Sequence, residues 1–357
     1  MKVALLGLTH PHSAILLTTL ANLPEVTQVC LWDADPAVVA APSLPPCRKA
    51  QSATADLDRL LAQPDLVLAI VCVRHDEAAA LALRVVNAGK HLLAEKPVGL
   101  TAAEIAPVEQ AAARAGVAAG VLYVRRAHPC VFAARQLVQS GALGPLLTLE
   151  SRFLTTQVRH RQPDSWLFRR RFSGGGILLW LGCHCLDLLH YISGEEIVEV
   201  GALLATRSGE AIDVDDSVAL AFRFNSGAIG TFHAGYTLAF SGAGYVNQAG
   251  YDAYLGFNGR SGRVVWPDLS PRLHLECAAP EGQSPVREQT FALPASSSYG
   301  GHGGEAFFRQ FFAAMNGRAR PPATLADAAR TARLVAAAEE SSRTGRFVRV
   351  AAPPPSP

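Results

Sequence analysis

Chemically active side chains gather in residues 173–194, "SGGGILLWLGCHCLDLLHYISG", an otherwise apolar stretch with the length of a helix. If it is helical, one face carries a row of polar and aromatic side chains at i, i+4, i+7 and i+11: Trp180, His184, Asp187 and Tyr191. An imidazole in such a row can carry a proton near neutral pH. The alternative for His184 is a core histidine bonded to a backbone carbonyl.

Two cysteines flank His184, but helical geometry keeps the three side chains from forming one site. Cys183 and Cys185 are two positions apart, roughly 200° around a helix axis, so they cannot join His184 around one tetrahedral metal ion. The same separation argues against a redox pair. We therefore expect no metal here.

A nucleotide-binding turn is indicated near the start of the chain. The strand-like run "KVALLG" ends at Gly7, but the loop that follows reads "GLTHPH" and not G-x-G-x-x-G. Thr9 and His12 stand where the second and third glycines would be, and Pro11 suits the first turn of a helix. The Thr9 hydroxyl and the imidazoles of His10 and His12 could compensate by donating hydrogen bonds to phosphate oxygens. An ordinary turn without a ligand is the alternative.

Asp33 stands at the end of the second strand-like run, "VTQVCLW". A carboxylate at that position accepts hydrogen bonds from both ribose hydroxyls and repels a 2′-phosphate, so NAD is favoured over NADP. In "DADP" the same residue can instead initiate a turn.

Strand and helix patterns alternate through the first third of the chain. This rhythm predicts a doubly wound parallel sheet, a Rossmann domain spanning residues 1–124. From 125 to 350, two helices near 129–140 and 177–193 precede several strand-like runs joined by Gly and Asn-Ser turns, which predicts an α+β domain built on a large, mostly antiparallel sheet. The tail 351–357, "AAPPPSP", is expected to be disordered.

The composition excludes several classes of partner. The 357 residues carry a formal net charge of +2 with 17% charged residues, so neither nucleic acid nor a membrane surface is an expected partner. The longest apolar run, 66–73, is far short of the ~20 residues of a spanning helix, and no signal peptide precedes the first strand. The seven cysteines indicate reduced thiols, and we expect a cytoplasmic protein.

The segment "AGKHLLAEKPVGLTAAE" at 88–104, together with the glycine-rich helix, resembles the Gfo/Idh/MocA oxidoreductase family. The likeness extends from residue 1 to about 350. It implies a Rossmann domain that binds NAD and a second domain that binds a small sugar or polyol. By the same analogy the antiparallel sheet mediates oligomer contacts, which implies a homodimer or homotetramer.

The resemblance assigns roles to the E-K-P motif. Lys96 is expected beside the nicotinamide, bonded to the substrate oxygen that loses or gains a proton, a task suited to a desolvated lysine. Glu95 and Pro97 are expected to contact the cofactor, with a cis Lys96-Pro97 bond as in similar proteins. Arg74 and His75 match a family turn that lies against the cofactor, although surface solvation is an alternative.

The histidine of the opening stretch also matches the family. His184 corresponds to a histidine that assists the proton transfer, and Asp187 to the acidic residue after it, with orienting His184, contacting substrate or capping a loop equally open. Many relatives carry an aspartate four residues before the histidine, where this chain has Trp180. Either Lys96 and His184 then act alone, or the chain has lost the reaction. Trp180 stacks on a sugar or packs in the core.

Two further residues complete the expected substrate site. Arg126, in "RRAHP", could bind a substrate hydroxyl or carboxylate or form a salt bridge between domains. Trp166 lies in the basic segment "QPDSWLFRRRFSGGG", which could attract an acidic substrate or simply expose its charge to solvent.

These residues favour an NAD-dependent dehydrogenase or reductase that moves hydride between the nicotinamide and a hydroxyl or carbonyl carbon of a sugar, polyol or derivative. A non-catalytic NAD-binding sensor or regulator is the alternative that "GLTHPH" and Trp180 favour. A third possibility is a sugar hydrolase or epimerase that uses bound NAD transiently.

Overall fold

The computed structural model describes residues 1–239, 250–279, 281–282 and 284–352. The chain divides into a first unit, Met1–His128 with Pro294–Ala329, and a second unit, Pro129–Leu293 with Arg330–Pro357. This differs from the single boundary expected after residue 124, because a segment near the end of the chain returns to the first unit. The expected disordered tail, 351–357, lies outside the described residues from 353 onward.

The first unit is built on a six-stranded sheet in the order β3-β2-β1-β4-β5-β6, with every pairing parallel. Its strands are β1 (Lys2–Leu6), β2 (Gln28–Trp32), β3 (Ala50–Thr54), β4 (Leu66–Val71), β5 (His91–Ala94) and β6 (Ala119–Val121). The central strands are almost wholly buried, as a sheet covered on both faces requires. The order reverses between β1 and β4, and open α/β sheets bind ligands at the carboxyl ends of the strands there.

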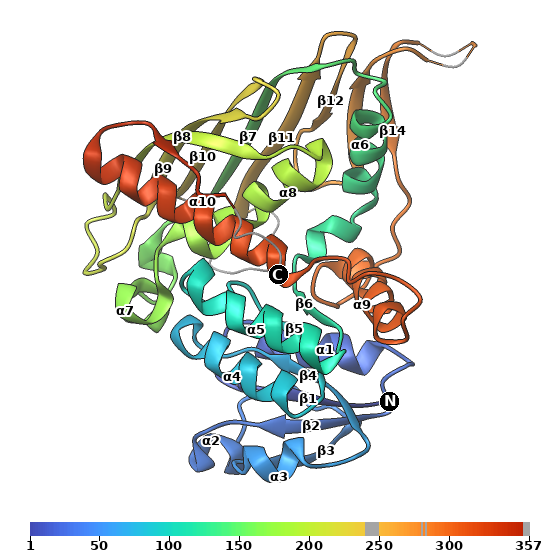
Figure 1. The fold of residues 1–357 in the computed structure, drawn as a ribbon, viewed down its shortest axis with the longest axis vertical. Helices are drawn as coiled ribbons and strands as arrows, with labels where there is room; N and C mark the ends of the chain where they lie inside the picture. The colour runs from blue at the N-terminus through green and yellow to red at the C-terminus, as the bar shows by residue number, and fades with distance from the viewer. Residues whose placement is uncertain (240–249, 280, 283, 353–357) are drawn as a thin grey trace. The chain divides into compact units, whose positions relative to one another are not determined.

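The first unit also contains helices. They are α1 (Ser13–Asn22), α2 (Pro36–Ala40), α3 (Leu57–Leu61), α4 (His75–Asn87), α5 (Ala102–Ala115), the 3₁₀ turn η1 (Val124–Ala127) and α9 (Gly301–Met315). Of these, α1, α3, α4, α5 and α9 each carry buried residues. Helices α4 and α5 pack side by side (Figure 1). A capping box begins α5: the Thr101 side chain accepts from the Glu104 N–H, and the Glu104 side chain reaches back to accept from the Leu100 N–H.

The segment that returns to the first unit, Pro294–Ala329 (the returning segment), is joined to the edge of this sheet by backbone hydrogen bonds. The Val121 N–H donates to the Ala323 carbonyl at 3.2 Å, and Gly120 forms an antiparallel bridge with Thr324. A Cβ on Gly120 would lie 2.7 Å from the same Ala323 carbonyl, so the close approach requires glycine.

The second unit contains a nine-stranded sheet in the order β14-β13-β12-β11-β7-β10-β9-β8-β15. Its strands are β7 (Leu146–Thr156), β8 (Ile197–Ala205), β9 (Ser217–Phe224), β10 (Ile229–Leu238), β11 (Tyr251–Gly259), β12 (Gly262–Trp266), β13 (Arg272–Glu276), β14 (Val286–Thr290) and β15 (Val348–Arg349). Among the described strands of this sheet only β7 and β10 pair in parallel, which confirms a mostly antiparallel sheet. The central strand β7 was not expected from the sequence.

One face of the second sheet carries helices and the other is open. Burial alternates strictly along β9, so every second side chain points into the core. The helical segments are α6 (Pro129–Gln139), η2 (Val158–His160), η3 (Trp166–Phe168), α7 (Arg170–Ser173), the π-helical turn η4 (Leu178–Gly182), α8 (Cys183–Ser193) and, running on from the first unit, α10 (Leu325–Thr344). Figure 1 shows α6 and α8 on the same face of this sheet, and α6 and α8 also contact each other.

The helix expected at 177–193 is present, but it does not have one type of hydrogen bonding throughout. It starts with the π turn η4, whose hydrogen bonds skip one residue more than those of an α-helix, and becomes α-helical only at Cys183. The stretch Arg170–Ser193 is long and apolar enough to cross a membrane by length and composition, but 89% of its most apolar window is buried inside the protein. It is a core helix of the second unit.

Candidate functional site

The turn after β1 has a backbone that only glycine can adopt. Gly7 has φ +101°, and a Cβ there would lie 2.1 Å from the carbonyl oxygen of Cys72. The Gly7 N–H donates to the Trp32 carbonyl at 2.8 Å, so the turn is held between the ends of β1, β2 and β4. The first fingerprint glycine thus keeps its structural role in this loop.

Asp33 braces the same turn from the carboxyl end of β2. One carboxylate oxygen accepts from the Leu8 N–H at 2.9 Å, and the other accepts from the Asp35 N–H at 3.1 Å. The side chain is half-buried, at the strand end where a ribose-binding carboxylate is expected. The turn-forming role and the ribose-binding role are therefore compatible.

The loop "GLTHPH" alternates between exposed and buried residues. Thr9 and Pro11 are exposed, whereas His10 and His12 are each 5% exposed. The two imidazoles were expected to donate to phosphate; the structure turns both rings inward. His12 Nδ1 lies 2.8 Å from Glu95 Oε1, and His10 Nδ1 accepts the His12 N–H at 3.0 Å.

The E-K-P motif follows β5 at the same sheet edge. Glu95 is 3% exposed and Lys96 is fully buried, with Lys96 Nζ 3.8 Å from Glu95 Oε1. The Lys96-Pro97 bond is cis, as the resemblance implies. The Tyr299 hydroxyl, from the returning segment, donates to Glu95 Oε1 at 3.4 Å. We call His12, Glu95, Lys96 and Tyr299 the Glu95 cluster.

Burial keeps the neighbouring titratable groups neutral. Burial lowers the pKa of His10 well below its ordinary value, and the nearby His12, His75 and Lys96 lower it further. Burial also lowers the pKa of His12, although the Glu95 carboxylate opposes this. Burial, reinforced by Glu95, raises the pKa of the Cys72 thiol, whose Sγ lies 3.2 Å from His10 Nδ1.

Arg74 and His75 are neighbours in sequence but differ in burial. His75 is 1% exposed at the start of α4, and its ring lies 6.4 Å from that of His10, centroid to centroid. Arg74 forms salt bridges to Asp76 at 3.0 Å and Glu77 at 2.7 Å. His75 therefore belongs with the buried groups behind the loop, and Arg74 with the partly exposed surface.

Arg126 forms a salt bridge, which was one of its two possible roles, but the bridge lies within the first unit and not between domains. Its Nη1 donates to Asp327 at 3.1 Å and to the Pro322 carbonyl at 3.0 Å. Burial alone would raise the pKa of Asp327, but the Arg126 guanidinium and the Thr324 N–H and hydroxyl outweigh it and hold the pKa at about 2. The pair fastens the returning segment to η1.

The predicted residues of the second unit lie along its core helix. Trp180, His184 and Asp187 are all buried, and Trp166, in η3, is half-buried. Within the described parts of the chain, no three His, Cys, Asp or Glu side chains gather into a possible metal site. Lys96 and His184 belong to different units, so their meeting at one substrate stays a prediction.

The start of this core helix depends on a residue that sequence reasoning did not single out. The Asp215 carboxylate accepts from the Gly176 N–H at 2.8 Å and the Leu178 N–H at 3.0 Å, and its carbonyl accepts from the Ile177 N–H. A Cβ on Gly176 would lie 1.8 Å from that carbonyl oxygen, which explains the third glycine of "SGGG". The sequence signal for this residue is the acidic pair Asp215-Asp216 directly before β9.

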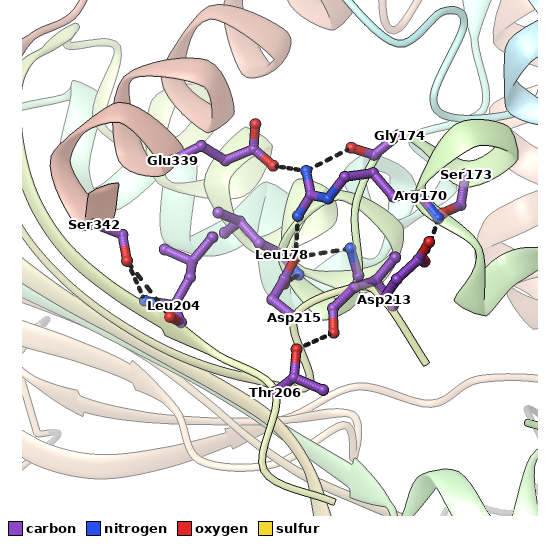
Figure 2. Close-up of polar contacts among 12 residues, drawn as sticks. Arg170, Ser173, Gly174, Leu178, Leu204, Thr206, Asp213, Asp215, Glu339 and Ser342 are labelled. Atoms are coloured by element: carbon purple, nitrogen blue, oxygen red, sulfur yellow. Dashed lines mark hydrogen bonds and ion pairs between the residues drawn. The ribbon is translucent and has the colours of Figure 1, made fainter. Parts of the chain in front are cut away.

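The Arg170–Glu339 ion pair lies next to the start of this helix and also stabilises it. Figure 2 shows the Arg170 side chain reaching from α7 toward Glu339 of α10, with Asp215 below it. Arg170 Nη1 donates to Glu339 at 2.8 Å and to the Gly174 carbonyl at 3.3 Å. Together these contacts fix where the helix that carries His184 begins.

Comparison with known families assigns both halves of the chain. Residues 1–123 match the model of an oxidoreductase family with an NAD-binding Rossmann fold, and residues 131–254 match the GFO/IDH/MocA C-terminal domain. The chain belongs to the Gfo/Idh/MocA oxidoreductase family. This confirms the resemblance read from the E-K-P segment and the glycine-rich helix, and with it NAD as the cofactor.

Individual Gfo/Idh/MocA relatives are distant in sequence. A levoglucosan dehydrogenase of Pseudarthrobacter phenanthrenivorans is 27% identical over 52% of this chain and 53% of its own length. A myo-inositol 2-dehydrogenase of Thermotoga maritima is 28% identical over 60% of each chain. The matched part spans about half the length of the curated relatives. A levoglucosan dehydrogenase solved with NADH and levoglucosan shares the fold, with a TM-score of 0.83, 22% identity and coverage of 98% of this chain and 99% of that one.

Proposed function

We propose that this protein is an NAD-dependent dehydrogenase or reductase that acts on a CH–OH or carbonyl carbon of a sugar, polyol or derivative. The observation that carries the proposal is the fully buried Lys96, held 3.8 Å from Glu95 at the carboxyl edge of the NAD-binding sheet. A buried amine next to a redox cofactor site is suited to moving the hydroxyl proton that must leave with the hydride.

The residues of this sheet edge fit NAD. Gly7 keeps the tight turn, and the exposed Thr9 and Pro11 precede the N-terminus of α1, where the positive end of the helix dipole favours an anion. Asp33 supplies the carboxylate that favours NAD over NADP. Glu95 Oε2 is buried and has no hydrogen-bond partner among the described residues, so it can accept from a bound ligand.

The proposed chemistry divides between cofactor and chain. NAD, when bound, accepts or returns the hydride. Lys96 takes the proton of the substrate hydroxyl in oxidation and returns it in reduction, and His184 assists as a second proton carrier. Trp180, in place of the family aspartate, contributes an aromatic face and no charge, so the two residues work without a third carboxylate.

The remaining expected contacts belong to the same proposal. Trp166 and Asp187 are proposed to contact the substrate from the second unit, and Glu95, Pro97 and His75 to line the cofactor side. Arg126 is not proposed as a substrate ligand, because Asp327 and Pro322 engage its guanidinium.

A spectrophotometric screen of NAD reduction across inositols, aldoses, ketoses and sugar acids tests the function. We expect turnover by the wild-type protein and a loss of 10²-fold or more in Lys96→Ala and His184→Ala. Lys90→Ala, which removes a lysine that donates to the Gln63 carbonyl, is the matched control and should keep full activity. Full activity in both site variants would refute the site; NADH binding without any turnover would favour the NAD-binding sensor.

We also propose that the open face of the second sheet joins copies of this chain into a homodimer or homotetramer. A groove of about 400 Å³ crosses this face, and its wall includes Ile229, which is 49% exposed, and Phe347, which is 62% exposed. Light scattering of Ile229→Asp should show a smaller species than wild type. The cytoplasmic location stays a prediction.

A further inference from the structure

One oxygen of Glu95 is shared by three groups. His12 Nδ1 lies 2.8 Å from Glu95 Oε1, the Tyr299 hydroxyl 3.4 Å and Lys96 Nζ 3.8 Å. His12 stands at the third glycine position of the nucleotide-binding fingerprint. Where the fingerprint has no side chain, this protein has an imidazole that reaches the E-K-P motif.

We propose that His12 is a positioning residue for Lys96: by donating its Nδ1–H to Glu95, it fixes the carboxylate and weakens the hold of that carboxylate on the Lys96 proton. This inference rests on the proposed function, in which Lys96 moves a proton. It adds a residue that acts through Glu95 and need not touch the substrate.

The direction of the effect follows from elementary electrostatics. A carboxylate within 4 Å of an ammonium group stabilises the charged form of the lysine. A short hydrogen bond from a neutral imidazole draws part of the negative charge toward the donor, so the lysine loses part of that stabilisation. With the ring neutral, its Nδ1–H is the donor that a carboxylate requires.

The titratable groups next to the Glu95 cluster come from several elements. They are His10 of the same loop as His12, Cys72 after β4 and His75 of α4, while the ring of Tyr299, in the cluster itself, lies 4.8 Å from that of His12, centroid to centroid. At neutral pH the thiol, the phenol and the buried imidazole of His10 are uncharged. Glu95 therefore supplies the negative charge nearest to Lys96 within this set.

The composition of the chain allows a direct test. The sequence contains four lysines: Lys2, Lys49, Lys90 and Lys96. A protein labelled with ¹³C at lysine Cε gives one NMR signal for each, and Lys96→Ala identifies the fourth. The midpoint of the Lys96 titration can then be measured in the full chain without cofactor or substrate, while the other three signals serve as internal controls.

Two substitutions at His12 separate the role of the donor from the volume of the ring. His12→Gly restores the fingerprint glycine and removes the donor, so the Lys96 midpoint should rise by about one pH unit. His12→Asn places an amide N–H near the position of Nδ1 and should return the midpoint most of the way to the wild-type value. His91→Asn, a substitution of a half-buried histidine in the same unit, should leave it unchanged.

A second readout links the shift to the reaction. In the direction of alcohol oxidation, the acid limb of the kcat/KM profile should move to higher pH in His12→Gly by the same amount, with the NADH dissociation constant within about threefold of wild type. An unchanged Lys96 midpoint in His12→Gly, or an equal shift in His12→Asn, would overturn the inference. Absence of turnover in the wild-type protein would overturn the proposed function instead, because the NMR titration needs none.

Discussion

The Nδ1 atom of His12 lies 2.8 Å from Oε1 of Glu95, which bonds the loop after β1 to the first residue of the E-K-P motif. Two sequence features that are 83 residues apart thereby form one buried contact. In a loop with glycine at the third fingerprint position, no side chain could make this contact. Histidine in place of the third glycine thus adds a hydrogen bond, from His12 to Glu95, at the sheet edge.

Gly7→Ala should destabilise the first unit more than an ordinary substitution of a glycine with positive φ. Both the backbone angle and the 2.1 Å approach of a Cβ to the Cys72 carbonyl oppose it, so we expect a loss of about 3 kcal/mol in urea unfolding. Gly89→Ala is the control, since Gly89 has φ +70° with nothing within 4 Å, and should cost about 1 kcal/mol. Equal losses in the two variants would contradict the proposed close contact.

Asp33→Asn should relax the choice of cofactor. Asparagine keeps an oxygen for the Leu8 N–H but removes the charge that repels a 2′-phosphate. We expect the ratio of kcat/KM for NADP to that for NAD to rise about tenfold, which corresponds to about 1.4 kcal/mol. Asp35→Asn, at an exposed carboxylate that caps α2, should leave the ratio unchanged. If the NADP to NAD ratio changed equally in Asp33→Asn and Asp35→Asn, Asp33 would have no specific role in the choice of cofactor.

The Arg126–Asp327 pair predicts a pH-dependent stability. The pKa of Asp327 is about 2 in the folded protein against an ordinary value of 3.8, so the pair contributes about 2 kcal/mol that is fully present above roughly pH 4 and is lost as the pH falls toward 2. Asp327→Asn should lower the free energy of unfolding by about 3 kcal/mol at pH 7, because it also leaves Arg126 buried without its counter-charge.

The difference between wild type and Asp327→Asn should shrink when unfolding is measured between pH 5 and pH 2. Asp65→Asn removes an exposed partner of Lys2 and should change stability by no more than about 0.5 kcal/mol. A gap between wild type and Asp327→Asn that is constant with pH would show that the carboxylate does not titrate with folding.

Sequence patterns predicted the regular elements of the first unit and missed contacts made over long distances. Strong runs such as 66–73 and the capping box at Thr101 carry their own local signal. Strand β7 does not, because Thr, Glu, Ser and Arg interrupt its apolar residues, and only its place between β10 and β11 makes it a strand. The return of residues 294–329 to the first unit likewise depends on pairing that no local pattern contains.

The candidate site shows the same division. Gly7 and Asp33 were identified from the strand, turn and helix pattern, and Lys96 from the family resemblance. The structure places all three at one sheet edge. The direction of the His12 ring could not be predicted, because a histidine in a loop can face solvent or core. The ring faces the core here because it contacts Glu95, which is 83 residues away in the sequence.

Asp215 should couple the stability of the second unit to the position of His184. Its carboxylate accepts two N–H groups at the start of the core helix, and such charge-assisted bonds contribute about 1.5–3 kcal/mol each. Asp215→Asn keeps one acceptor and should lose about 2 kcal/mol in thermal unfolding and at least tenfold in kcat, with a smaller change in the NADH dissociation constant. Asp213→Asn is the control: this exposed carboxylate accepts the Arg170 N–H (Figure 2), and asparagine keeps an oxygen for that bond, so stability and kcat should stay close to wild type. If Asp215→Asn lost stability but kept its full kcat at a temperature where it is folded, the helix start would matter for folding and not for placing His184.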